Sequence, residues 1–172
     1  MAFITQSSTF YSFADYADVV ALDSRLFQTN EGLSSDSVED ACIRSTTRIL
    51  DQIRNTDWWK GYYIHQSGSF NNVVIAQSIS VPAPDPFLIR ARQQDFTDLC
   101  CYHALSQYLY PRVADFGNPD NAERQKIGFY DQKYRVLFDE LIQDGDWYDF
   151  DNSGTVTAAE KSPNRVSLVR TR

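Results

Sequence analysis

Twelve residues near the C-terminus have the types and spacing of a calcium-binding loop. They read DFDNSGTVTAAE and occupy positions 149–160, which we call the acidic loop. Calcium takes about six to eight oxygen ligands, and a loop of this kind supplies them from alternate positions and from its last residue. In this chain those positions hold Asp149, Asp151, Ser153, Thr155, Thr157 and Glu160. The pattern therefore predicts a divalent cation site.

The residues of the acidic loop also predict how tightly it binds. Thr155 would use its backbone carbonyl, Thr157 a bridging water, and Glu160 both carboxylate oxygens. Gly154 stands where such a loop turns sharply and a side chain would obstruct the turn. Because few of the ligands are carboxylates, we expect calcium to bind with a dissociation constant on the order of 10⁻⁵ to 10⁻³ M, and magnesium to fit less well. The alternative is a metal-free acidic turn in which Gly154 and Asn152 serve only the backbone.

The surroundings of the acidic loop favour a structural role over a signalling one. Sensor loops come in pairs and open a Met-rich groove, whereas this chain has one such loop and a single Met. Pro163 also ends the helix that would leave the loop. Carboxylates crowded here repel one another until a cation neutralises them: Asp144, Asp146, Asp149 and Asp151. We therefore expect the cation to fix the direction of the residues that follow.

The remaining residues give little support to an enzyme. The sequence has no Gly-x-Ser-x-Gly, no glycine-rich phosphate loop and no His-Glu-x-x-His. Both histidines, His65 and His103, lack a partner pattern and are expected to be structural. The three cysteines (Cys42, Cys100 and Cys101) lack zinc-ligand spacing, which indicates buried reduced thiols. An enzyme would have to work with carboxylates alone, so we predict no enzymatic activity.

Charge is distributed unevenly along the chain. The last twelve residues carry four basic residues and no acidic ones, so with a total of −7 the first 160 residues carry −11. This acidic charge on residues 1–160 argues against tight binding of nucleic acid. It is compatible with a surface along which DNA moves without being bound. Residues 161–172 are either a solvated end or, as we predict, a C-terminal arm for an acidic partner. Their alternating pattern suits addition as a strand to that partner. Its predicted partner-binding residues are Lys161, Arg165, Val166, Leu168, Arg170 and Arg172.

Hydrophobic periodicity predicts four helices. The first spans residues 13–28, and the second is capped by Asp36. The third spans residues 89–110 and stops at Pro111, and the fourth runs from Asn118-Pro119 to about residue 143. The predicted inner residues are Val38, Cys42, Ile49, Leu50 and Ile53 in the second helix, Phe96, Leu99, Cys100, His103, Leu105 and Leu109 in the third, and Ile127, Tyr130, Tyr134, Leu137, Phe138 and Leu141 in the fourth.

The middle of the chain is less regular. Two β-prone runs, 62–65 and 73–81, predict a hairpin or a loop, and the prolines at 82, 84 and 86 predict an extended connector. The predicted fold is mainly α: a helical bundle of three to four helices with an irregular or β-hairpin insert and an extended C-terminal arm. Its parts are a helical domain (1–148, with the insert at about 60–86), the acidic loop and the arm. No apolar run is long enough to cross a membrane, and the N-terminus has no signal-peptide pattern, so we expect no membrane partner.

Several long segments resemble the head–tail connector proteins of tailed bacteriophages, also called adaptor, neck or head-completion proteins. The segments are YADVVALDSRLF (16–27), SVEDACIRSTTRIL (37–50) with IRNTDWW (53–59), RQQDFTDLCCYHALSQYLYPRVADFGNPDNAERQKIGFYDQKY (92–134) and LIQDGDWYDFDNSGTV (141–156). The likeness covers most of the chain and lies in these long blocks rather than in a short motif.

The resemblance implies a mainly α-helical subunit that forms a ring, commonly of about twelve copies, in the neck of the virion. Such a ring lies beneath the portal protein, continues the DNA channel and carries the next neck or tail protein. A C-terminal segment often engages the portal in this family, and we expect the arm to do so. The subunit would be made in the host cytoplasm. The alternative is a calcium-binding regulatory or interaction module built on the acidic loop.

Overall fold

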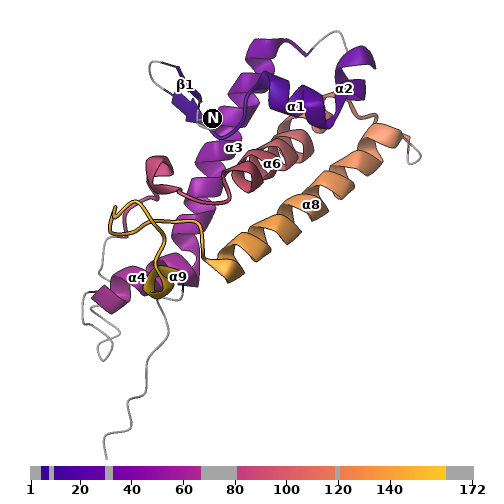
Figure 1. Ribbon diagram of the computed structural model, residues 1–172. Helices are drawn as coiled ribbons and strands as arrows, with labels where there is room; N and C mark the ends of the chain where they lie inside the picture. The colour runs from indigo at the N-terminus through magenta and orange to yellow at the C-terminus, as the bar shows by residue number, and fades with distance from the viewer. Residues whose placement is uncertain (1–4, 8–9, 30–32, 67–80, 119–120, 162–172) are drawn as a thin grey trace, which may run out of the picture. The chain divides into compact units, whose positions relative to one another are not determined.

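The computed structural model describes residues 5–7, 10–29, 33–66, 81–118 and 121–161, which are mainly helical (Figure 1). The predicted mainly α fold class is confirmed. Strands β1 (Thr5–Ser7) and β2 (Phe10–Ser12) form an antiparallel pair with Gln6 opposite Tyr11. The chain divides into two compact units: Met1–Ile49 with Arg92–Glu140, and Leu50–Ala91 with Leu141–Arg172.

The first unit contains helices α1 (Tyr16–Leu22), α2 (Ser24–Thr29), α6 (Gln93–Ala104) and α7 (Tyr110–Val113), with parts of α3 (Ser35–Asn55) and α8 (Ala122–Asp144). Its core is apolar, with the ring of Phe13 edge-on to that of Phe96 at a centroid distance of 5.3 Å. The predicted inner residues of α3 are buried except Leu50, which is half-buried, and all those predicted for the third helix are buried. Of the six predicted for α8, Tyr130, Tyr134 and Leu141 are buried, whereas Ile127, Leu137 and Phe138 are only half-buried.

The predicted helix over residues 13–28 is wrong as a single element, because the chain leaves the helical conformation at Asp23. The backbone of Asp23 has φ −144° and ψ 78°, and its amide donates to the carbonyl of Val19 to close α1. Phe13 precedes α1, and its amide donates to Oγ1 of Thr46 at 3.0 Å. Asp15 caps α1 in a capping box with Asp18, which sets the true start of the helix.

The predicted stop at Pro111 is also wrong, because the helix widens before the proline instead of ending. Residues Leu105–Leu109 form a π turn, and the amide of Tyr110 donates to the carbonyl of Leu105. Helix α7 then continues to Val113. Proline removes one helical donor and its ring crowds the carbonyl four residues earlier, so a locally wider turn accommodates it. At its other end the helix starts at Gln93 rather than Ile89.

Two other predicted helix starts move by two or three residues, to the side chain that caps each helix. The amide of Ser37 donates to Oγ of Ser34, so α3 begins one residue before Asp36. The amide of Arg124 donates to Oδ1 of Asn121, so α8 begins after the predicted Asn118-Pro119 signal. Serine and asparagine are among the preferred capping residues, and several candidates stood close together in both places.

The second unit corrects the prediction for the insert. Residues 62–65, predicted as β-prone, belong to helix α4 (Asp57–Gln66). Thr56 precedes this helix, and its hydroxyl accepts from the amide of Trp59 at 3.2 Å. Burial of Trp58 and Trp59 outweighs the weak strand preference of the residues that follow them. The predicted run 73–81 lies outside the described residues except for Val81. The proline segment then leads into a 3₁₀ turn, η1 (Pro86–Leu88).

A buried polar cluster in the first unit centres on Asp23, whose side chain is 7% exposed. Its Oδ2 accepts hydrogen bonds from the hydroxyls of Tyr110 and Tyr130 and from Nζ of Lys126. Burial opposes the charged form, but these three donors outweigh it and lower the pKa of Asp23. The cluster therefore ties the break between α1 and α2 to α7 and α8.

The cysteines and His103 are buried, as predicted. All three cysteines are buried and free; hydrogen bonding with Cys100 together with burial raises the pKa of Cys42, and burial raises that of Cys101. His103 is 6% exposed, and its Nδ1 lies 3.0 Å from Oγ of Ser45. Burial, with a smaller contribution from Arg48, lowers the pKa of His103 to about 4. No described helix is long and apolar enough to cross a membrane.

We expect His103 to make the free energy of unfolding depend on pH. Folded His103 stays neutral down to about pH 4, whereas an unfolded histidine titrates near pH 6.5. Between these values the unfolded chain binds more protons, so stability falls as the pH is lowered from 6.5 towards 4, by about 3 kcal/mol at about 1.4 kcal/mol per unit. Urea unfolding of the wild type and His103→Gln at pH 7 and pH 4 measures this. The wild type should lose more stability than the variant, and parallel losses would contradict the assignment.

Candidate metal centre

The acidic loop starts from a backbone that is held on both sides. Ile89 and Tyr148 form an isolated antiparallel bridge. The amide of Arg90 donates to the carbonyl of Trp147 at 2.9 Å, and the amide of Asp149 donates to the carbonyl of Leu88 at 3.0 Å. The first predicted ligand is therefore fixed by pairing with a segment far away in the sequence.

An aromatic cluster in the second unit surrounds the second residue of the loop, Phe150. The rings of Tyr62 and Phe150 stack at a centroid distance of 3.7 Å, and Trp59 lies 5.1 Å from Phe150. The whole cluster comprises Trp58, Trp59, Tyr62, Tyr63, Trp147, Tyr148 and Phe150. It gives the short loop an apolar base, which the loop's own polar sequence does not provide.

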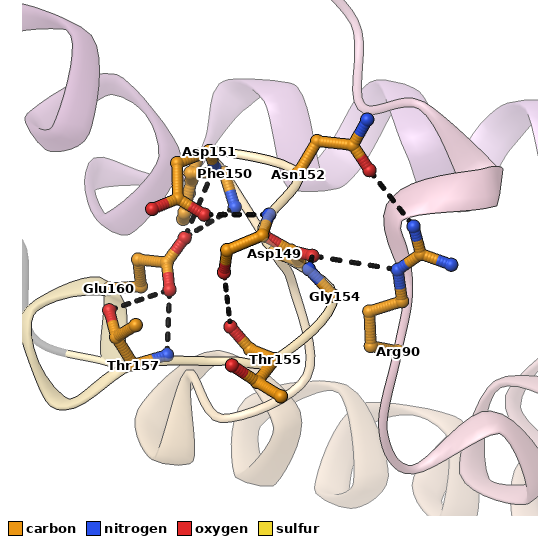
Figure 2. A network of polar contacts seen from close by, with 10 residues as sticks. Arg90, Asp149, Phe150, Asp151, Asn152, Gly154, Thr155, Thr157 and Glu160 are labelled. Carbon is orange, nitrogen blue, oxygen red and sulfur yellow. Dashed lines mark hydrogen bonds and ion pairs between the residues drawn. The ribbon is translucent and has the colours of Figure 1, made fainter.

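Asp149 has a fully buried carboxylate that accepts from the loop's own backbone. The amide of Gly154 donates at 2.7 Å and that of Ser153 at 3.1 Å, while Nε of Arg90 lies 3.5 Å away (Figure 2). Burial raises the pKa of Asp149, but the two amides, with Asp151 and Arg90, outweigh burial and lower it. The group is therefore charged at neutral pH.

Glu160 closes the loop from its other end. Its carboxylate accepts four hydrogen bonds: from the amides of Phe150 and Asp151 at 2.7 and 3.2 Å, and from the amide and hydroxyl of Thr157, both at 2.7 Å (Figure 2). Thr157 precedes the single-turn helix α9 (Ala158–Lys161). Burial opposes ionisation, but these donors lower the pKa of Glu160.

Three of the predicted ligands come together as carboxylates. Oxygens of Asp149, Asp151 and Glu160 all lie within 4.8 Å of one another. Calcium–oxygen distances are about 2.3–2.6 Å, so ligands on opposite sides of the ion lie about 5 Å apart. The spacing and the oxygen chemistry therefore fit a hard divalent cation. Gly154 has φ +92°, a left-handed conformation that favours glycine, as the loop pattern requires.

The other predicted ligands are engaged within the loop. The hydroxyl of Ser153 donates to the carbonyl of Thr155 at 3.1 Å, and that of Thr157 donates to Glu160. These internal hydrogen bonds are also compatible with the metal-free acidic turn, the alternative to a cation site in the sequence analysis. In the arm, Lys161 is the exposed last residue of α9. The other predicted arm residues lie outside the described part of the chain: Arg165, Val166, Leu168, Arg170 and Arg172.

Sequence reasoning missed Arg90 and the aromatic cluster. Arg90 reaches Asp149, and its NH2 group donates to Oδ1 of Asn152 at 2.9 Å (Figure 2). Asn152 has φ +54°, so this contact steadies a backbone conformation that few residues adopt. No spacing rule links an arginine to a loop so distant in sequence. The concentration of tryptophan and tyrosine at 58–63 and 147–150 was the one available signal for the cluster.

Comparisons with protein-family models, with curated proteins and with solved structures find no match to this chain.

Proposed function

We propose that this chain is a structural subunit of the head–tail connector of a tailed bacteriophage. Copies of it would form a ring, of about twelve subunits, that joins the portal to the next neck or tail protein and continues the DNA channel. The observation that carries this proposal is the resemblance of long blocks between residues 16 and 156 to that family. The mainly α fold agrees with it. The proposed role is structural and includes no catalysis.

The outer face of α8 supports contacts between copies. Phe129 and Val136 are 54% and 60% exposed, and they are seven residues apart, which places them on one face of the helix. Nζ of Lys133 lies 5.7 Å from the centre of the Phe129 ring. Exposed aromatic and apolar side chains of this kind suit the buried centre of an interface.

The charge distribution supports a channel wall that does not retain DNA. Residues 1–160 carry a net charge of −11. A protein that binds DNA tightly neutralises phosphates with clustered lysine and arginine, which an acidic body opposes. DNA would therefore pass along the ring without sequence-specific binding.

Within this function we assign the acidic loop to a structural Ca²⁺ site of modest affinity. Asp149, Asp151 and Glu160 would hold the ion, and the ion would supply the positive charge that their three carboxylates lack. Its role would be to hold α9, and so the start of the arm, against the aromatic cluster. Calcium would brace the subunit rather than signal.

The second candidate function is a calcium-binding regulatory or interaction module, which the same three carboxylates favour. The two functions differ in what calcium changes. A module would bind its partner in only one calcium state. A connector subunit would join portal complexes in both states, and more weakly in chelator because the start of the arm is no longer braced. Co-sedimentation with the portal protein of the same phage, with calcium or with a chelator, separates them.

Deleting residues 162–172 is expected to weaken incorporation into portal complexes by tenfold or more. The arm supplies basic residues that an acidic partner would pair with, and tenfold corresponds to about 1.4 kcal/mol of lost contact. The measurement is quantitative co-sedimentation of the purified chain with portal rings. Circular dichroism confirms that the shortened chain keeps its helices.

The triple variant Arg165→Gln, Arg170→Gln and Arg172→Gln is the matched control for this deletion. It removes charge but keeps the length of the arm. If charge carries the contact, its loss equals that of the deletion, and if strand addition carries it, the loss is smaller. Full incorporation of the deleted chain would refute the proposed role of the arm.

A further inference from the structure

The three tryptophan indoles differ in their hydrogen bonds. Nε1 of Trp59 donates to the carbonyl of Pro82 at 2.9 Å, and Nε1 of Trp147 donates to the carbonyl of Leu141 at 2.8 Å. Trp58 is only 8% exposed, and its buried Nε1 has no hydrogen-bond partner in the described part of the chain. A buried donor that has lost water and found no acceptor is costly, and such groups need an explanation.

A backbone acceptor lies close to this indole, across Gly145. A Cβ at Gly145 would stand 2.6 Å from Nε1 of Trp58 and 2.7 Å from the carbonyl oxygen of Lys161. Lys161 is the last residue of α9, so its carbonyl has no partner within that helix. Donor and acceptor therefore border the same small space, which stays open because glycine has no side chain. A small shift of α9 would bring them to a hydrogen-bond distance of about 3 Å.

Glu160 provides a reason for α9 to shift. A carboxylate has about four lone-pair sites, and Glu160 already accepts four hydrogen bonds. A cation that takes its oxygens must displace some of these donors, which lie on Thr157 and on the amides of Phe150 and Asp151. Glu160 belongs to the single-turn helix α9, so its movement carries Lys161 with it.

We propose that cation binding at the acidic loop closes a hydrogen bond from Nε1 of Trp58 to the carbonyl of Lys161. This contact fixes the end of α9, where the arm begins. The inference rests on the proposed cation site. It adds a defined bracing contact, in which Trp58 is the donor that gains its acceptor when the ion binds.

Calcium titration of the full chain tests this hydrogen bond. Calorimetry records the heat of binding, and NMR records the indole ¹H–¹⁵N resonances of the same samples. On saturation the Trp58 resonance should move downfield and its hydrogen exchange should slow by tenfold or more. The resonances of Trp59 and Trp147, whose hydrogen bonds exist already, should change much less. Heat of binding with an unchanged Trp58 resonance overturns the Trp58–Lys161 hydrogen bond alone. No heat of binding and no shift of the resonance overturns both the cation site and that hydrogen bond.

Replacing the donor gives a second, independent readout. Trp58→Phe keeps an aromatic ring but removes the N–H, so calcium affinity should fall by roughly threefold to tenfold, the effect of losing one hydrogen bond from the bound state. Trp59→Phe is the matched control, because it removes an indole whose bond to Pro82 is present without the ion. Equal affinities for Trp58→Phe and the wild type would overturn the inference.

Discussion

Replacing Asp149 by alanine is expected to remove calcium binding from the acidic loop. Asp149 is the buried carboxylate of the group formed with Asp151 and Glu160, and it accepts the amides that shape the turn. Without it, two carboxylates remain and the turn loses its internal acceptor, so affinity should fall by at least about a hundredfold. Terbium luminescence sensitised by Trp147 or Tyr148, followed by calcium competition, measures the loss.

Two further variants make this result specific. Asp139→Ala removes an exposed carboxylate of α8 outside the loop, and it should bind terbium as the wild type does. Asp149→Asn removes the charge but keeps an oxygen for one of the two amides, because Ser153 donates to Oδ1 and Gly154 to Oδ2. It therefore separates loss of charge from complete loss of the turn's acceptor. An Asp149→Ala signal equal to that of the wild type, or a wild type without any signal, would refute the site.

Replacing Asp23 by alanine is expected to destabilise the chain by about 3 kcal/mol. The change leaves Nζ of Lys126 without its carboxylate and leaves the buried hydroxyls of Tyr110 and Tyr130 without their shared acceptor. Removing one partner of a buried ion pair costs about 3–5 kcal/mol. The lower end of this range applies because the Lys126 side chain is 35% exposed. Urea unfolding followed by circular dichroism gives the free energy of unfolding.

Asp40→Ala is the matched control for this prediction. Asp40 pairs with Arg44 at 2.9 Å on the surface of α3, and both side chains are more than half exposed. A surface pair four residues apart contributes only about 0.3–0.5 kcal/mol, so this variant should unfold close to the wild type. Similar losses from the two variants would contradict the importance assigned to the buried cluster.

The inner faces of α3 and of the third predicted helix could be identified from the sequence because they depend on local spacing. Apolar residues three and four positions apart fall on one face of any helix, so Val38, Cys42, Ile49 and Ile53 were assigned to the core correctly. The same reasoning could not locate the helix ends. At Pro111 the outcome depended on a π turn that the neighbouring residues accommodate.

The three carboxylates of the acidic loop were also predictable, since they lie within twelve residues and the turn at Gly154 brings them together. Only the tertiary structure placed Arg90 beside Asp149 and the aromatic cluster around Phe150.

By itself, then, the sequence determined the helical class, the inner faces of α3 and of the third predicted helix, and the set of candidate ligands, all of which follow from short-range patterns. The tertiary structure decided which buried polar groups find partners. Asp23 meets Lys126 and two tyrosines across long stretches of chain, and Trp58 is left facing Lys161 over Gly145. Such pairings depend on how distant segments pack, and no local pattern encodes them.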